Sequence, residues 1–159
     1  MAGGKGTRMS SSIPKQYLIL RNKPVILYSI ESFFIEDNTT EIILVLPEQH
    51  IEYWKNLCVQ YSITIPHTII AGGSERFYSV QNGLQHVQES GLIAVHDGVR
   101  PLVTPQLIGS GYSHAATYGT AIPVVDSIDS LRQITETSHA IVDRNTIKRV
   151  QTPQIFKSE

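Results

Sequence analysis

Apolar residues along the chain follow two patterns: short unbroken runs, and longer stretches in which they recur about every 3.6 positions. The unbroken runs predict buried strands, because leucine and β-branched residues follow one another without polar alternation. They lie at Glu41–Leu46 and Leu92–Val95, with weaker runs at Thr68–Ile70 and Thr120–Val125. The periodic stretches predict helices at Val25–Phe34, Glu48–Tyr61, Arg76–Gln88 and Pro105–Tyr118. The last helix has Thr104 as its N-cap and Pro105 at its first position, where both residue types are favoured.

Strands and helices alternate, which predicts an α/β fold with right-handed crossovers and a largely parallel sheet in three layers. No repeat, low-complexity segment or Pro/Gly-rich linker divides the 159 residues, so we expect a single domain at 1–159. In sheets of this type ligands bind beyond the carboxyl ends of the strands. The residues that follow each strand are therefore the first candidates for a site.

Composition excludes several classes of partner. The net charge of −1 gives no basic field that would gather nucleic acid. No apolar run approaches about 18 residues, and the N-terminus has no signal-peptide-like apolar region, so we expect no membrane segment and a cytoplasmic protein. Cys58 is the only cysteine, which excludes an internal disulfide and a thiolate metal cage, and we interpret it as a small core residue.

The first candidate site is the glycine-rich stretch at 3–8 (GGKGTR). Glycines let the backbone approach a ligand closely and present N–H groups to phosphate oxygens, and Arg8 adds a bidentate guanidinium. Lys15, directly after Pro14, supplies a second cation. The stretch matches neither a Walker A loop nor a full G-x-G-x-x-G, and no predicted strand precedes it. The alternative interpretation is a terminal tail with ordinary surface charges.

The second candidate follows the predicted strand at 92–95. Asp97 at the tip of this strand is well placed to hold Mg²⁺, which takes one or two carboxylates together with substrate phosphates, and Gly98 leaves room for a ligand. The alternative is that Asp97 caps the following turn and pairs with Arg100. His96 has no second His or Glu at metal-ligand spacing, so we interpret it as structural.

The third candidate is the pair Gly72-Gly73 with Ser74, which opens the predicted helix at Arg76 and makes an anion-ready helix N-terminus. Connectors of this type are also common without a ligand. The polar residues at 142–145 and 151–154, taken alone, indicate only surface. Together, three loops bring glycine, cation and carboxylate to one edge of the sheet. This suits phosphoryl or nucleotidyl transfer, in which the protein positions the reactants and neutralises charge.

A series of motifs runs in order through nearly the whole chain. They are AGGKGTRM at 2–9, PKQYL at 14–18, GGSERFYSVQNGL at 72–84, VHDGVRPLVTPQLI at 95–108, DS at 129–130, VDRN at 142–145 and QTPQIF at 151–156. In this the sequence resembles the 2-C-methyl-D-erythritol 4-phosphate cytidylyltransferase family of the non-mevalonate isoprenoid pathway. The motifs are specific for sugar- or polyol-phosphate cytidylyltransferases, and VHD-x-x-RP with DRN…TPQ favours the methylerythritol branch.

The resemblance implies a Rossmann-like nucleotidyltransferase sheet in three layers, with a protruding β-arm near 125–150 that exchanges contacts in a homodimer. It also implies that the triphosphate of CTP lies against Ala2, Gly3, Gly4 and Arg8. The cytosine and ribose would meet Gly73, Ser74, Ser79, Asp97 and Gly98.

The resemblance further implies the reaction and the residues that serve it. Arg8 and Lys15 would stabilise charge while a phosphate oxygen of methylerythritol phosphate attacks the α-phosphorus and pyrophosphate leaves. Asp97 would help to hold Mg²⁺, and Arg100 would line the acceptor side. Thr152 and Arg144, the latter reaching across from the partner subunit, would grip the acceptor phosphate.

The sequence departs from the family pattern in three ways. The family has an apolar strand before the glycine loop where this sequence has Met1, and it continues well past the position of Glu159. Asp126 lies where a proline is common. A missing central strand would leave two neighbouring strands unpaired and the glycine loop without its anchor. We therefore expect weak or no turnover from these 159 residues.

Two other functions fit the motifs. A ribitol-5-phosphate cytidylyltransferase shares the AGGKGTRM…PKQ and TPQ-x-F motifs, and differs in the acceptor. A truncated, non-catalytic paralogue that dimerises through the arm and binds CTP is the alternative from another class. A paralogue that had lost its function long ago would be expected to have lost site residues, but this sequence retains Arg8, Lys15, Asp97 and Arg144.

Overall fold

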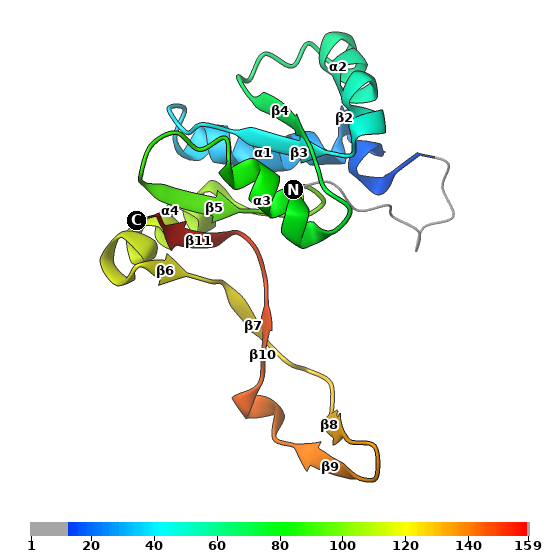
Figure 1. The fold of residues 1–159 in the computed structure, drawn as a ribbon, viewed down its shortest axis with the longest axis vertical. Coiled ribbons are helices and arrows are strands. Elements are labelled where there is room, and N and C mark those ends of the chain that lie inside the picture. Colours follow the sequence, from blue (N-terminus) through cyan, green and yellow to red (C-terminus); the bar gives the residue numbers. More distant parts are fainter. Residues whose placement is uncertain (1–12, 159) are drawn as a thin grey trace.

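The computed structural model describes residues 13–158 and has the expected α/β architecture, with a long narrow arm extending from a layered body (Figure 1). The helices are α1 (Val25–Glu36), α2 (Ile51–Gln60), α3 (Arg76–Leu84) and α4 (Pro105–Tyr118), with short 3-10 turns η1 (Lys15–Tyr17), η2 (Glu48–His50) and η3 (Arg144–Thr146). Within the described part of the chain, no helix is long and apolar enough to cross a membrane.

The strands fall into two groups, those of the body and those of the arm. Those of the body are β1 (Ile19–Leu20), β2 (Lys23–Pro24), β3 (Ile43–Leu46), β4 (Thr68–Ala71), β5 (Leu92–Val95), β6 (Thr120–Ala121) and β11 (Gln154–Lys157). Those of the arm are β7 (Val124–Asp126), β8 (Leu131–Ile134), β9 (His139–Val142) and β10 (Lys148–Val150). All four predicted helices and the runs at 41–46, 68–70 and 92–95 are therefore present, with shifted ends except for the helix at 105–118 and the strand at 92–95.

The expectation of a largely parallel sheet is only partly correct. β3 and β4 pair in parallel, but β11 lies between β5 and β6 and runs antiparallel to both. β5 and β6 are thus parallel to each other, as expected for strands joined by the crossover helix α4. β11 reverses this direction because the chain returns to the body directly from the arm, without a helical crossover.

β3 and β5 face each other across a gap in the body. Among the described strands β3 pairs only with β4, and β5 only with β11. A cavity of about 580 Å³ lies between them, with α1 on one side and α3 on the other. α1 and α4 cover one face of the body and α3 covers the other, so the layers are those of a three-layer α/β domain (Figure 1).

The main core lies where α1 and α2 pack near β3. Trp54, Ile26 and Leu46 are fully buried there, and Tyr17 is almost so. The Trp54 indole donates a 3.0 Å hydrogen bond to Nε2 of His67, which satisfies its polar edge inside the core. Cys58 packs at the margin of this core, as we predicted for a small apolar residue.

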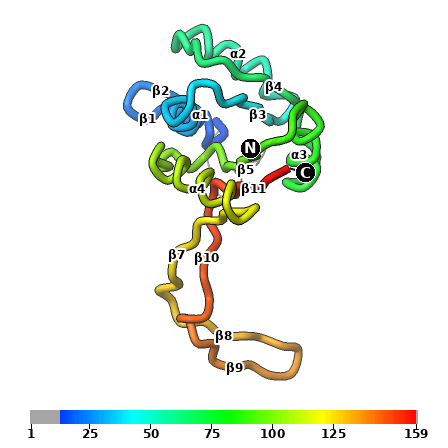
Figure 2. Tube along the Cα trace, turned by 90° about the vertical axis from the view of Figure 1, so that its left-hand side faces the viewer, coloured from blue at the N-terminus to red at the C-terminus, as the bar shows by residue number. Residues whose placement is uncertain are grey.

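The arm consists of two antiparallel pairs in series. β7 pairs with β10 next to the body, and β8 pairs with β9 farther out (Figure 2). The predicted strand at 120–125 is divided between β6 and β7, because Pro123 has no N–H for a ladder. The carbonyl of Pro123 instead accepts a 2.8 Å hydrogen bond from the backbone N–H of Gln151, which closes the base of the arm.

α4 begins and ends at the predicted residues because both of its caps are encoded locally. The Thr104 hydroxyl accepts the backbone N–H of Leu107 at 3.2 Å, and Pro105 occupies the first turn. Gly119 ends the helix with a φ of 83°, a left-handed conformation that glycine adopts without steric cost.

We predict that Thr104→Ala lowers the free energy of unfolding by about 1 kcal/mol, because one N-terminal backbone donor of α4 loses its acceptor. Thr104→Ser should retain most of the stability. Thr117→Ala, an exposed threonine in the last turns of the same helix, is the control. Urea denaturation measures all three variants. Equal losses for the two alanine variants would show that the cap contributes nothing specific.

Candidate active site

Three segments meet at the carboxyl ends of β4 and β5. They are the loop from Gly72 to Glu75, the loop from His96 to Arg100, and the residues after β10, Gln151 to Pro153. The first two follow strands, as the sequence predicted for a ligand site. The third was interpreted as plain surface when its spacing alone was considered, yet it contacts the second loop directly.

The loop after β4 is shaped by its glycines and by Ser79. The N–H of Gly72 donates to the carbonyl of Leu46 at 2.7 Å, and that of Gly73 donates to the Ser79 hydroxyl at 3.0 Å. A side chain at Gly73 would overlap Cβ of Tyr78, so this position accepts only glycine. Ser79 is buried and holds the loop, while Ser74 lies exposed at its tip.

Asp97 is held between two arginines, one from its own loop and one from the start of α3. Nε of Arg100 donates to Oδ2 at 3.0 Å, which is the pairing that the alternative interpretation of the sequence anticipated. Arg76, at the first position of α3, donates to Oδ1. Arg76 was not among the residues predicted for the site. Its only sequence signal was a cation at the start of a helix that follows a glycine loop. The structure thus joins the two loops through one carboxylate.

The electrostatics of Asp97 reflect this arrangement. Burial raises the pKa of the Asp97 carboxyl, but hydrogen bonds from Arg100 and Arg76 outweigh it, so the pKa lies below its usual value. The carboxylate is therefore ionised at neutral pH. The loop that carries it is fastened to α1, because Ser29 donates to the carbonyl of Arg100 at 3.3 Å and Ser32 to that of Val103 at 2.9 Å.

His96 and Thr152 form a buried pair behind Asp97. The Thr152 hydroxyl lies 3.0 Å from Nδ1 of His96 and accepts the backbone N–H of Asp97 at 3.2 Å. Burial lowers the pKa of His96 to about 4, so the imidazole is neutral at physiological pH. These contacts agree with the interpretation of His96 as a structural residue.

The other predicted site residues are distributed as follows. Lys15 begins η1, half-buried, two residues before the core residue Tyr17. Gly98 is buried in the loop after β5. Arg144 lies in η3 on the arm, where its guanidinium donates to the carbonyl of Ile128 at 2.8 Å. Ala2, Gly3, Gly4 and Arg8 lie outside the described residues.

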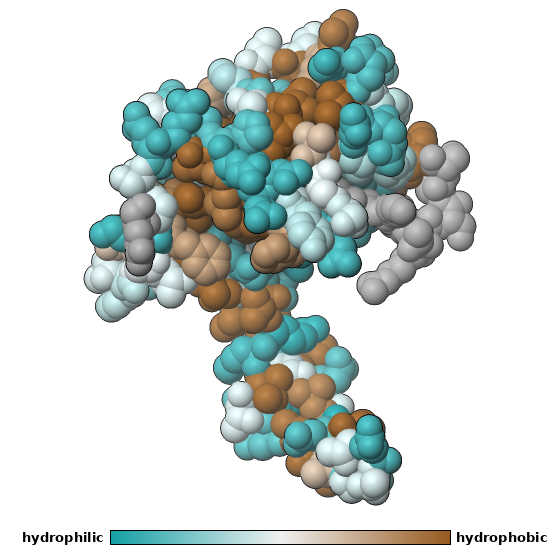
Figure 3. All heavy atoms as spheres, in the orientation of Figure 1, coloured by the Kyte–Doolittle hydropathy of each residue, from teal (hydrophilic) through white to brown (hydrophobic). Residues whose placement is uncertain are grey.

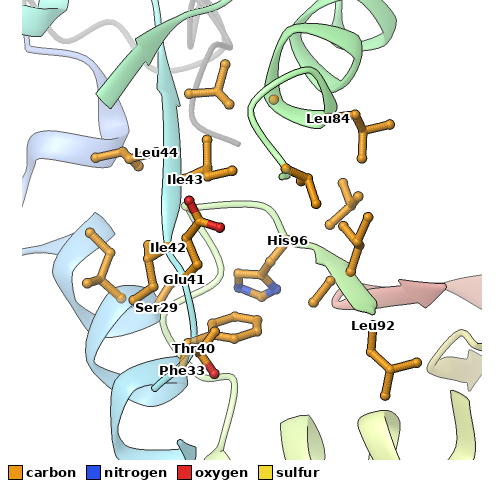
Figure 4. A pocket seen from close by; sticks show the side chains of 18 of the residues that line it. Ser29, Phe33, Thr40, Glu41, Ile42, Ile43, Leu44, Leu84, Leu92 and His96 are labelled. Atoms are coloured by element: carbon orange, nitrogen blue, oxygen red, sulfur yellow. The ribbon is translucent and has the colours of Figure 1, made fainter. Parts of the chain in front are cut away.

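The cavity between β3 and β5 does not suit a triphosphate. Figure 4 shows its apolar lining from β3, α3 and β5, with His96 and Phe33 extending into it. None of the described residues around it is a lysine or arginine, and Glu36 and Glu41 lie at its margin. A polyanion held there would lack compensating charge. The cations lie instead around Asp97, at the edge of the strands.

Comparison with known proteins gives consistent results. A model of the family described as 2-C-methyl-D-erythritol 4-phosphate cytidylyltransferase matches residues 1–159. A protein of that name from Phocaeicola vulgatus is 46% identical over 157 residues, covering 99% of this chain and 72% of that protein. One from Bacteroides thetaiotaomicron is 45% identical over 159 residues, covering 100% and 73%.

Solved structures show the same similarity. The structure of 4-diphosphocytidyl-2C-methyl-D-erythritol synthase from Anaerococcus prevotii has a TM-score of 0.81 at 24% identity, over 98% of this chain and 66% of that one. The 2-C-methyl-D-erythritol 4-phosphate cytidylyltransferase of Thermus thermophilus has a TM-score of 0.72 at 25% identity, over 91% and 65%. These similarities confirm the Rossmann-like nucleotidyltransferase fold that the motifs implied.

The burial of neutral His96 predicts how stability depends on pH. Its pKa is about 4 when folded against an ordinary value of 6.5, so below pH 6.5 the unfolded chain binds the extra proton. We expect the free energy of unfolding to fall by about 3 kcal/mol between pH 6.5 and 4 from this group alone. His96→Asn, which cannot titrate, should remove this part of the slope. Urea denaturation across the range tests this, with exposed His114→Asn as the control. Equal slopes for wild type and His96→Asn would contradict it.

Proposed function

Because the chain belongs to the 2-C-methyl-D-erythritol 4-phosphate cytidylyltransferase family, we propose that it transfers CMP from CTP to 2-C-methyl-D-erythritol 4-phosphate in isoprenoid biosynthesis. The observation that carries this proposal is the meeting of Asp97, Arg76 and Arg100 beside a glycine loop at the carboxyl ends of β4 and β5. A negatively charged substrate finds both a close-fitting backbone and cations there.

The reaction exchanges one phosphorus–oxygen bond for another. A phosphate oxygen of the acceptor attacks the α-phosphorus of CTP, the bond from that phosphorus to the bridging oxygen breaks, and pyrophosphate leaves. Negative charge grows on the transferred group and on pyrophosphate, so fixed cations lower the barrier. We assign this role to Lys15, and to Arg8 on the grounds of the sequence motif.

We propose that the CTP site is shared between the two glycine loops. Gly73, Ser74 and Gly98 would approach the nucleoside closely, with Ser79 fixing the shape of the first loop through its hydrogen bond to Gly73. Ala2, Gly3 and Gly4 would line the triphosphate. Arg100, whose side chain is 41% exposed, would face the acceptor.

Asp97 is suited to hold Mg²⁺ as its one protein carboxylate. The described residues contain no group of three or more His, Cys, Asp or Glu side chains that could hold a metal ion. Mg²⁺ commonly binds through one or two carboxylates plus substrate phosphates, so a lone Asp97 fits this chemistry. The ion would neutralise triphosphate charge. Arg76 and Arg100, which now bind both carboxylate oxygens, would then be available to phosphate.

We further propose that the arm forms a homodimer. Three of its isoleucines are unusually exposed for aliphatic side chains: Ile128 at 73%, Ile134 at 71% and Ile141 at 81%. Figure 3 shows apolar surface along the arm. Apolar residues gathered on a protruding element indicate a protein interface. Arg144 lies on the same arm, so dimer formation would carry its guanidinium toward the acceptor phosphate at the partner's site.

The activity test is release of pyrophosphate from CTP, methylerythritol phosphate and Mg²⁺ by the purified chain, with ribitol 5-phosphate as the comparison acceptor. We expect product only with methylerythritol phosphate, and at the weak rate expected from the sequence of these 159 residues. Asp97→Asn should lower kcat/KM at least about a hundredfold, because the single carboxylate for the metal is lost. Glu52→Gln, at an exposed position of α2, should leave the rate unchanged.

Other outcomes of this test separate the competing functions. Preference for ribitol 5-phosphate would assign the chain to the other acceptor. CTP binding by calorimetry without any turnover would support the non-catalytic alternative. The absence of both CTP binding and turnover would contradict the proposed function.

If the arm forms the dimer interface, one charge introduced there should weaken the dimer. Placing a lysine at Ile141 desolvates an ammonium at the proposed interface, so Ile141→Lys should raise the dimer dissociation constant about tenfold or more. Val59→Lys is the matched control, since Val59 is 82% exposed on α2 of the body. Sedimentation equilibrium measures both variants. A monomeric wild type, or equal effects of the two lysines, would overturn this assignment of the interface.

A further inference from the structure

The return strand of the arm enters the body at the site itself. Gln151 and Thr152 are the first two residues after β10, and they contact Arg100 and Asp97 respectively. Neither contact was expected from the spacing of these residues. Two consecutive residues at the base of the arm therefore hold the two members of one ion pair.

The hydroxyl of Thr152 has a defined direction. It is buried, with Thr152 only 7% exposed, and it accepts the N–H of Asp97 at 3.2 Å. Its single proton is then available to Nδ1 of His96, 3.0 Å away, which accepts it because the imidazole is neutral. The chain of hydrogen bonds runs from Asp97 through Thr152 to His96, and it fixes the backbone from which the carboxylate projects.

Gln151 connects the same loop to the arm. Its side-chain oxygen accepts a hydrogen bond from the Arg100 guanidinium, and its backbone N–H donates to the carbonyl of Pro123 at 2.8 Å. Pro123 precedes β7, the outgoing strand of the arm. Both strands of the arm are therefore linked through Gln151 to an arginine of the site.

We propose that Gln151 and Thr152 are positioning residues for the Asp97–Arg100 pair and couple the base of the arm to the substrate site. The effect of these residues on turnover rests on the proposed function, whereas their hydrogen bonds do not depend on it. In this role Thr152 does not touch the substrate but holds the backbone of Asp97 in place. The competing role is direct contact with the acceptor phosphate, as the family resemblance implies for this residue.

Hydrogen exchange of the Asp97 amide tests the positioning contact without any substrate. Thr152→Val keeps the shape of the side chain but removes the hydroxyl, so protection of this amide should fall about tenfold or more. Thr152→Ser should restore it. Thr120→Val is the matched control, because Thr120 donates to the carbonyl of Ile155 at 3.2 Å in the same body sheet, away from the site. Unchanged protection in Thr152→Val would overturn the proposal even if the protein has no activity.

Binding and kinetics separate positioning from contact with the acceptor. Thr152→Val and Gln151→Met should each weaken CTP binding about tenfold relative to wild type, as measured by calorimetry without the acceptor. Both substitutions should also lower kcat. For Thr152→Val the KM for methylerythritol phosphate should stay close to wild type, and Thr152→Ser should recover both parameters. Gln151→Met should raise the acceptor KM in addition to weakening CTP binding, because its partner Arg100 faces the acceptor. A raised acceptor KM with unchanged CTP affinity would overturn the proposal in favour of direct contact. Should Thr152→Val fail to fold, Gln151→Met and Thr152→Ser carry the same comparison.

Discussion

A carboxylate partly removed from water needs positive charge beside it, and Asp97 obtains that charge from two arginines on different segments. Arg76 can reach it only if α3 begins where the glycine loop ends, and Arg100 only if the loop after β5 stays fastened to α1. The base of the arm then holds both Arg100 and the Asp97 backbone. One helix, one loop and the base of the arm thus all meet at this single charge.

The body and the arm are stabilised in different ways. The body has a core in which Trp54, Tyr17 and Leu46 are buried almost completely. The buried N–H of the Trp54 indole donates a hydrogen bond to His67. The arm has backbone pairing but leaves its isoleucines in water. The net charge of −1 provides no general attraction for a polyanion, whereas Arg76 and Arg100 lie together at Asp97, near the base of the arm.

Local signals predicted the elements well, whereas contacts between distant residues could not be predicted from spacing. α4 matched at both ends because Thr104, Pro105 and Gly119 encode its limits locally. The predicted helix at 76–88 ends instead at Leu84, and Pro123 divides the predicted strand at 120–125. The tight β1–β2 hairpin was missed because its turn uses Arg21 and Asn22 at positive φ rather than glycine. The contacts of Arg76 and Gln151 depend on how loops converge, which no local pattern records. The family motifs supplied the assignments that spacing could not.

The gap between β3 and β5 also has a consequence for how the body melts. Within the described residues, the β3–β4 ladder and the β5–β11–β6 ladder share no backbone hydrogen bonds, and helix packing, such as α1 against α4, joins them. Ladder cooperativity ends at an edge, so each half can open while the other keeps its pairing.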